Sequence, residues 1–201
     1  MAHSAMPDSL LDTFVPVYDI VERHQIHTEA PAVRTFAAAC AMEMSDSWLV
    51  RLIFRAREWL FGAKPSARQL PHGLIEQTKA LGWGVLAEAP GREIVMGAVT
   101  QPWLADVEFR ALPPLDFARF HEPGFVKIAW TLRADPDDGG SLFRTETRAV
   151  ATDSVARDKF RRYWRRVWPG VWLIRRLMLG PLKRRAESRI EEVPCTSRGH
   201  C

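Results

Sequence analysis

The sequence lacks any uncharged apolar run long enough to cross a bilayer, because charged residues interrupt every hydrophobic stretch. Met1 to Val17 contain no basic segment followed by an apolar block, which is the pattern of a secretory signal. Cysteine is scarce: Cys40 lies in an apolar stretch, whereas Cys195 and Cys201 lie in a polar C-terminal segment, so the cysteines form no disulfide framework. Together these features predict a cytoplasmic protein.

Several catalytic and metal-binding motifs are also missing. The sequence contains no Walker loop, no GxSxG, no HExxH and no CxxC, which excludes the enzyme classes that depend on them. Four residues match part of a calcium-loop pattern: Asp135, Asp137, Gly140 and Glu146. The flanking segments, however, have the pattern of strands, and Gly139 offers no side-chain ligand where the loop needs one. His24 and His27 fall on opposite faces of a strand. We therefore predict no metal and no cofactor.

The length of 201 residues, 47% of them hydrophobic, suffices for one domain with one sizeable core. We predict a domain over residues 18–189, preceded by a flexible arm at 1–17 and followed by a disordered tail at 190–201. The arm and the tail are polar and show no sustained hydrophobic periodicity.

The first half of the domain reads as one strand followed by helices. Tyr18 to Thr28 alternates as a strand does. The alanine-rich stretch from Ala32 to Met44 predicts a helix, and residues 45–62 predict a second one, with capping residues before it and a glycine at its end. Residues 63–80 predict a connection, with a short helix before Gly82.

Residues 83–152 consist of short alternating segments separated by turn residues, which indicates a meander of antiparallel strands. The clearest hairpin joins Phe125–Ala134 to Leu142–Ala151 through a turn rich in Asp and Gly. After Asp153 or Ser154, either of which can act as a cap, apolar residues recur at helical spacing from about Val155 onward. Pro169-Gly170 must kink this helix or split it in two.

This order of elements resembles the START-like or Bet v 1-like superfamily, also called SRPBCC, to which polyketide cyclases belong. The resemblance covers Tyr18 to Glu187, and its segments look like a bacterial branch of the superfamily: SDSWLVRLIFR (45–55), EAPGREIVMG (88–97), FARFHEPGFVKIAW (117–130) and TETRAVATDSVARDKFRRYWR (145–165). It implies an α+β helix-grip fold, in which a curved antiparallel sheet wraps around a long, kinked C-terminal helix and two short helices follow the first strand. It further implies an apolar cavity that binds lipids, hormones or polyketides, and some members catalyse cyclisation or aromatisation.

Ligand-binding candidates follow from the strand pattern. Thr145 and Thr147 share one face of the last strand, where a fully packed core would favour larger side chains, so they leave space and offer hydroxyl groups. Trp130 lies on the inward face of the preceding strand. Trp164 and Val167 on the C-terminal helix are expected to face it, with Tyr163 at the rim. The alternative interpretation is that the threonines only suit a strand and the aromatic residues only fill the core.

Two further patterns bear on chemistry and solvation. His121 precedes a Pro-Gly turn, so for an enzyme it is the candidate base and Tyr163 the candidate proton donor; the alternative is a solvent-facing turn histidine. Charged residues alternate along the outward face of the last two strands, which predicts a solvated convex face: Lys127, Arg133, Arg144, Glu146 and Arg148.

Positive charge is concentrated near the C-terminus. Arg157 to Arg189 holds twelve Lys/Arg and two Asp/Glu, net +10, and the remainder carries 16 − 22 = −6. The arginines predict the solvent-exposed face of a helix: Arg161, Arg162, Arg165, Arg166, Arg175 and Arg176. With Trp168 and Trp172 the same region could instead rest on an anionic membrane. Nucleic acid is disfavoured because only the charge supports it.

The sequence therefore predicts binding or transport of an apolar small molecule. A cofactor-free cyclase or aromatase that uses the same cavity is the alternative, and peripheral association with an anionic membrane is a second one. Oligomeric state and ligand identity do not follow from the sequence.

Overall fold

The computed structural model describes residues 9–43 and 71–188. Its strands form one antiparallel sheet in the order β1-β6-β5-β3-β2, and β4 also pairs with β3, at Val99 and Thr100. The strand bounds are β1 Ile20–Thr28, β2 Gly84–Ala89, β3 Glu93–Thr100, β4 Phe109–Arg110, β5 Val126–Asp137 and β6 Gly140–Ala151. The helices are η1 Leu10–Thr13, α1 Ala32–Cys40, α3 Leu74–Ala80, α4 Pro114–Arg119 and α5 Ser154–Glu187.

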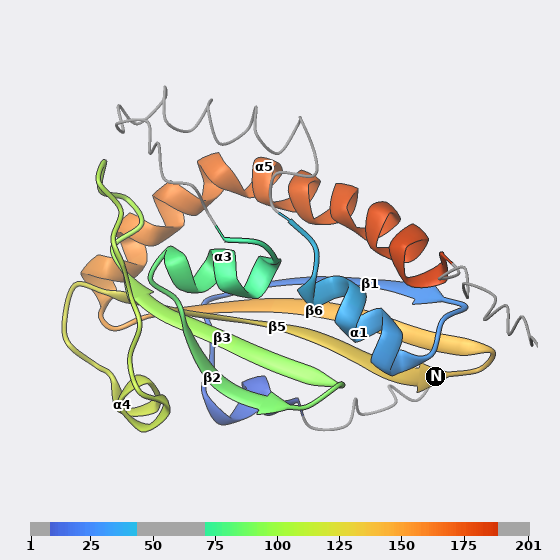
Figure 1. The fold of residues 1–201 in the computed structure, drawn as a ribbon. Helices are drawn as coiled ribbons and strands as arrows, with labels where there is room; N and C mark the ends of the chain where they lie inside the picture. Colours follow the sequence, from blue (N-terminus) through green and yellow to red (C-terminus); the bar gives the residue numbers. More distant parts are fainter. Residues whose placement is uncertain (1–8, 44–70, 189–201) are drawn as a thin grey trace, which may run out of the picture.

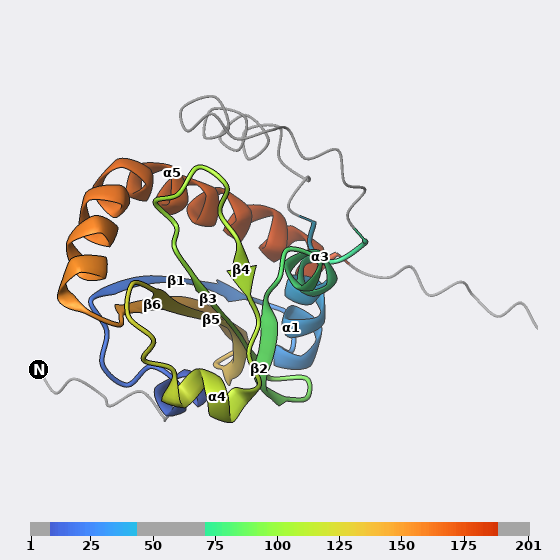
Figure 2. The same ribbon diagram turned by 90° about the vertical axis from the view of Figure 1, so that its left-hand side faces the viewer.

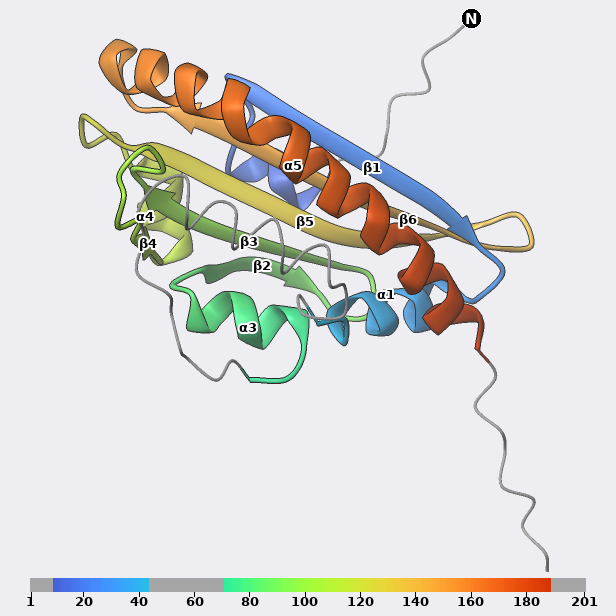
Figure 3. The same cartoon turned by 90° about the horizontal axis from the view of Figure 1, so that it is seen from above.

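The long helix α5 lies across one face of the sheet, and α1 and α3 lie beside it on the same face (Figures 1 and 3). Asp153 caps α5 by accepting the backbone N–H of Ala156. The sequence predicted that Pro169-Gly170 would kink this helix or split it. The helix is continuous to Glu187 and bends near its middle (Figure 1), so the kink is the alternative that holds. This arrangement confirms the predicted α+β helix-grip fold.

The predicted hairpin is confirmed, with strands that are longer than the sequence indicated. Asp137 pairs with Gly140, so only Asp138 and Gly139 connect β5 to β6. Gly139 has a φ of 74°, a left-handed conformation that glycine adopts without a steric penalty. The strand at 20–28 and the helices α1 and α3 also match the predictions, whereas the helix expected at 45–62 lies outside the described residues.

Besides η1, two small elements were not predicted. Residues 83–152 were expected to form only strands and turns, yet Pro114 begins the helix α4, where its missing N–H removes no helical hydrogen bond. The two-residue strand β4 has too little pattern to be recognised in the sequence.

Four of the five charged residues that were predicted on a solvated convex face are buried, so the prediction is wrong for them; Arg144 is partly exposed. Lys127, Arg133, Glu146 and Arg148 are each no more than 8% exposed. Figure 2 shows the reason: η1 and α4 lie against the side of the sheet opposite α5. The buried arginines are paired with carboxylates, since Arg148 Nε donates to Glu146 at 2.6 Å and Arg133 Nε donates to Asp135 at 2.7 Å. Lys127 instead donates to the Ala118 carbonyl at 2.9 Å.

The N-terminal segment that covers this face was expected to belong to a loose arm. From residue 9 onward it is instead packed on the sheet: Leu11 is fully buried and Val15 is 1% exposed. Arg148 Nη1 donates to Asp12 at 2.6 Å and to the Val15 carbonyl at 2.9 Å, which ties the segment to β6. Residues 1–8 and the predicted tail at 190–201 lie outside the described residues.

No helix in the described part of the chain has both the length and the apolar character needed to span a membrane.

Candidate functional site

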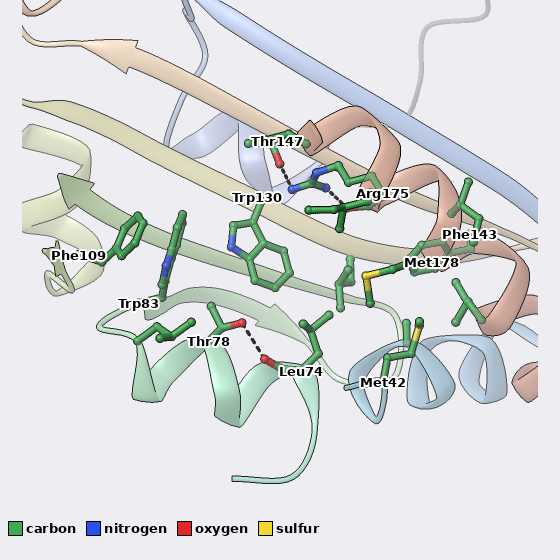
Figure 4. Close-up of a pocket in the computed structure, with 18 residues that line it drawn as sticks. Met42, Leu74, Thr78, Trp83, Phe109, Trp130, Phe143, Thr147, Arg175 and Met178 are labelled. Atoms are coloured by element: carbon green, nitrogen blue, oxygen red, sulfur yellow. Dashed lines mark hydrogen bonds between the residues drawn. The ribbon is translucent and has the colours of Figure 1, made fainter. Parts of the chain in front are cut away.

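A cavity of about 380 Å³ lies between the concave face of the sheet and α5, with α1 and α3 along its side (Figure 4). This volume is within the range of small-molecule binding pockets. β5 and β6 supply its floor, and α5 supplies its roof through Val171, Ile174, Arg175, Met178, Leu179 and Leu182. A sheet that packed fully against these helices would leave no such space.

Aromatic side chains form one wall of the cavity. Trp83 packs edge-on against Trp130, with ring centroids 6.3 Å apart, and lies 5.0 Å from the ring of Phe109. Figure 4 shows these three rings side by side at one end of the cavity, and Met178 and Met42 toward the other. Aromatic and thioether side chains offer a large, polarisable apolar surface without a charge.

The floor follows the predicted strand faces. Trp130 pairs with Thr147 across β5 and β6, and Leu132 pairs with Thr145, so all four side chains point to the same face and line the cavity. Thr78, on α3, also lines it, but its hydroxyl donates to the Leu74 carbonyl at 2.7 Å and is therefore engaged with its own helix.

Arg175 is the only charged side chain among the described residues that line the cavity. It enters from α5, where Nη1 donates to the Thr145 hydroxyl at 3.0 Å and Nη2 donates to the Thr147 hydroxyl (Figure 4). The two threonines thus anchor a guanidinium at the boundary between sheet and helix.

Arg175 is partly buried, and its charge is costly to remove from water. Desolvation lowers the pKa of Arg175 to about 10, and the attraction of Glu22 offsets only part of that effect. Arginine with such a pKa is still protonated at neutral pH. The cavity therefore contains a permanent positive charge among apolar walls.

A second polar group lies on β1 next to this charge. His24 Nε2 is 2.9 Å from a Glu22 oxygen, and the other Glu22 oxygen accepts the Trp168 indole N–H at 3.0 Å. Burial is the main reason that the pKa of His24 is lowered, and the charge of Arg175 lowers it further against the opposing effect of Glu22. Neither His24 nor Glu22 is among the residues that line the cavity.

The other predicted ligand-binding residues lie elsewhere on α5. Tyr163 and Trp164 pack against Phe160 in a separate apolar cluster, with the Trp164 and Phe160 rings 5.9 Å apart. Val167 does not line the cavity either. The helix faces the cavity only after its bend, from Val171 onward, so the first half of the apolar stripe contacts a different part of the sheet.

The structure places His121 in an exposed loop, where its Nδ1 is 2.7 Å from the Arg119 carbonyl. In the described part of the chain no histidine and no carboxylate lines the cavity. The group that sequence reasoning missed is Arg175, which was assigned to the solvent-exposed face of the helix. Its position was visible in the spacing, because residue 175 follows Val171 by four and precedes Met178 by three, which puts all three on one helical face.

Comparisons with known proteins add only distant likenesses. No protein-family model matches the chain, and no curated protein is significantly similar to it in sequence. Among solved structures, protein CV1439 from Chromobacterium violaceum, a structural-genomics target, is 14% identical with a TM-score of 0.41, and the match covers 84% of this chain and 98% of that one. Ara h 8.0201 is 11% identical with a TM-score of 0.26, over 81% of this chain and 97% of that one.

Proposed function

We propose that this protein binds an apolar small molecule, lipid-like or polyketide-like, in the cavity between the sheet and α5 and releases it chemically unchanged. The observation that carries the proposal is the cavity itself: about 380 Å³ of space with walls that are almost entirely apolar side chains. Trp130, Thr145 and Thr147 are the proposed contacts from the sheet. This function agrees with the sequence resemblance to the START-like superfamily.

Binding is favoured over catalysis by the chemistry of the walls. A cyclase or aromatase without a cofactor must move protons, which requires a group that titrates near neutral pH within hydrogen-bond distance of the substrate. The polar groups that line the described cavity are three threonines, the tryptophan indoles and Arg175, and none of them titrates near neutral pH. His121, the candidate base, is exposed in a loop outside the cavity.

Native mass spectrometry of protein purified from cells tests this function. A retained small-molecule mass is expected for the wild-type protein. It should disappear in Val171→Trp, which fills the cavity, and persist in Leu177→Trp, which adds the same side chain at a position on α5 that is 37% exposed. A retained mass that is unaffected by Val171→Trp would place the ligand elsewhere and refute the proposal.

A second candidate function is peripheral binding to an anionic membrane. Trp168 and Trp172 are 44% and 38% exposed on α5, where the preceding turns present Arg161 and Arg165 to solvent. Interfacial tryptophan next to basic residues is typical of helices that rest on lipid headgroups. Such contact would bring a lipid-binding cavity close to its source of ligand.

Vesicle cosedimentation tests the membrane candidate. The protein should bind vesicles of phosphatidylglycerol but not of phosphatidylcholine, and binding should be lost when Arg161, Arg162, Arg165 and Arg166 are all replaced by Gln. High salt should have a similar effect. Equal binding by the wild-type and the fourfold variant would refute it.

A further inference from the structure

Arg175 carries a charge that the protein only partly compensates. A guanidinium has five N–H groups, and two of them donate to the hydroxyls of Thr145 and Thr147, which leaves three. The structure records no further acceptor for them among residues 9–43 and 71–188. Hydroxyl oxygens satisfy hydrogen bonds but supply no negative charge, so among the described residues that line the cavity the cation has no ion-pair partner.

The neighbouring carboxylate does not fill this role. Glu22 attracts Arg175 through space, but no described carboxylate oxygen lies within 4.0 Å of the guanidinium. One Glu22 oxygen accepts the Trp168 indole N–H, and the other lies 2.9 Å from His24 Nε2. Elsewhere in the molecule, buried arginines do have such partners, as Arg133 and Arg148 show. Arg175 therefore differs from the structural arginines of the same protein.

We propose that the ligand is an apolar molecule with a single carboxylate, and that this carboxylate pairs with Arg175 while the apolar part lies against Trp83, Trp130 and Met178. The inference rests on the proposed function and adds the chemical class of the ligand. A guanidinium suits a carboxylate because its planar N–H groups can donate two parallel hydrogen bonds.

The charge count favours a monovalent anion. One guanidinium neutralises one carboxylate, whereas a phosphate monoester carries between one and two negative charges near neutral pH and would leave an excess in an apolar cavity. Among the described lining residues no second cation is available to balance it. A neutral ligand with a hydroxyl or carbonyl oxygen could accept from the remaining N–H groups, but it would leave the charge of Arg175 without a counterion.

The test compares probes that share one alkyl chain. Dodecanoate, dodecanol and dodecylamine are titrated into the wild-type protein below their aggregation concentrations and followed by isothermal calorimetry. We expect dodecanoate to bind at least about tenfold more tightly than dodecanol, because a charge-assisted pair forms in a desolvated site. Dodecylamine should bind more weakly than either, since it places a second cation beside Arg175.

The variant arm isolates the side chain. Arg175→Met should lose the preference for dodecanoate over dodecanol while keeping its affinity for dodecanol. Arg176→Gln is the matched control: it removes the adjacent charge, which is exposed on the outer side of α5, and should keep the preference. The wild-type comparison does not depend on either variant folding.

The outcomes separate the two proposals. Equal affinity of the wild-type protein for dodecanoate and dodecanol would overturn the carboxylate inference and leave the apolar binding function intact. Absence of binding by all three probes would refute both. A preference that persists in Arg175→Met but is lost in Arg176→Gln would assign the anion to the outer surface of the helix and also overturn the inference.

Discussion

Glu93 offers the sharpest test of how the N-terminal segment is attached. It lies on β3, is 3% exposed, and accepts the hydroxyl of Ser9 at 2.7 Å and the backbone N–H of Leu10 at 3.2 Å. Its other oxygen is 3.7 Å from Arg133 Nη1. Glu93→Ala would remove the acceptor for both N-terminal groups and leave Arg133 with Asp135 as its remaining described ion-pair partner.

The expected loss can be worked from these contacts. Breaking a buried ion pair costs about 3–5 kcal/mol, and we expect roughly 3 kcal/mol because Arg133 keeps Asp135. For a domain of this size that corresponds to a fall in Tm of roughly 6–12 °C. Urea unfolding followed by tryptophan fluorescence measures the change. Glu88→Ala, on the exposed side of β2, is the control and should stay within about 0.5 kcal/mol of wild type. An equally small effect of Glu93→Ala would refute the packing of the segment on the sheet.

Three further predictions concern single side chains. The pKa of His24 is lowered below 6.5, mainly by burial, so the unfolded chain binds more protons than the folded one. The stability that depends on neutral His24 should therefore be lost as the pH falls through the pKa of the folded state. An NMR titration of His24 with a midpoint above 6.5 would contradict this. Burial raises the pKa of the Cys40 thiol to about 11, so little thiolate forms at neutral pH. In a variant with Cys195 and Cys201 replaced by Ser, Cys40 should react with iodoacetamide far more slowly at pH 7.5 than free cysteine does. An equal rate would show an accessible thiolate. A Cβ at Gly140 would lie 2.0 Å from the Thr28 carbonyl oxygen. Gly140→Ala should therefore destabilise the protein by about 1–3 kcal/mol in the same urea assay. If the variant were as stable as the wild type, β1 would have to shift to accommodate the added methyl group.

Much of the fold was predictable because its signals are local. Alternation in the strand at 20–28, the turn before Gly140 and the cap at Asp153 each specify backbone geometry through neighbouring residues. The burial of the convex face was not predictable in this way. Alternating charges on β5 and β6 are typical of an exposed sheet, and only the packing of η1 and α4, which are distant in sequence, shows that Arg148 and Glu146 are covered.

The candidate site was predictable from the sheet and not from the helix. Trp130, Thr145 and Thr147 follow from strand periodicity and do line the cavity. The helix presents a long apolar stripe, and periodicity alone does not say which of its turns face the cavity. The sequence therefore predicted Trp164 and Val167, whereas the helix residues that line the cavity lie between Val171 and Leu182. Arg175 was missed because an arginine within a basic run is ordinarily solvent-exposed.

The central claim is that an apolar molecule lies inside the cavity, and isotope-filtered NOE spectroscopy tests it most directly. With protonated dodecanol bound to ¹³C-labelled protein, we predict NOEs from the alkyl chain to the Trp130 and Trp83 rings and to the Met178 methyl group. NOEs confined to Trp168 and Trp172, which are 44% and 38% exposed and do not line the cavity, would contradict the claim and show that the apolar molecule binds the surface of the helix.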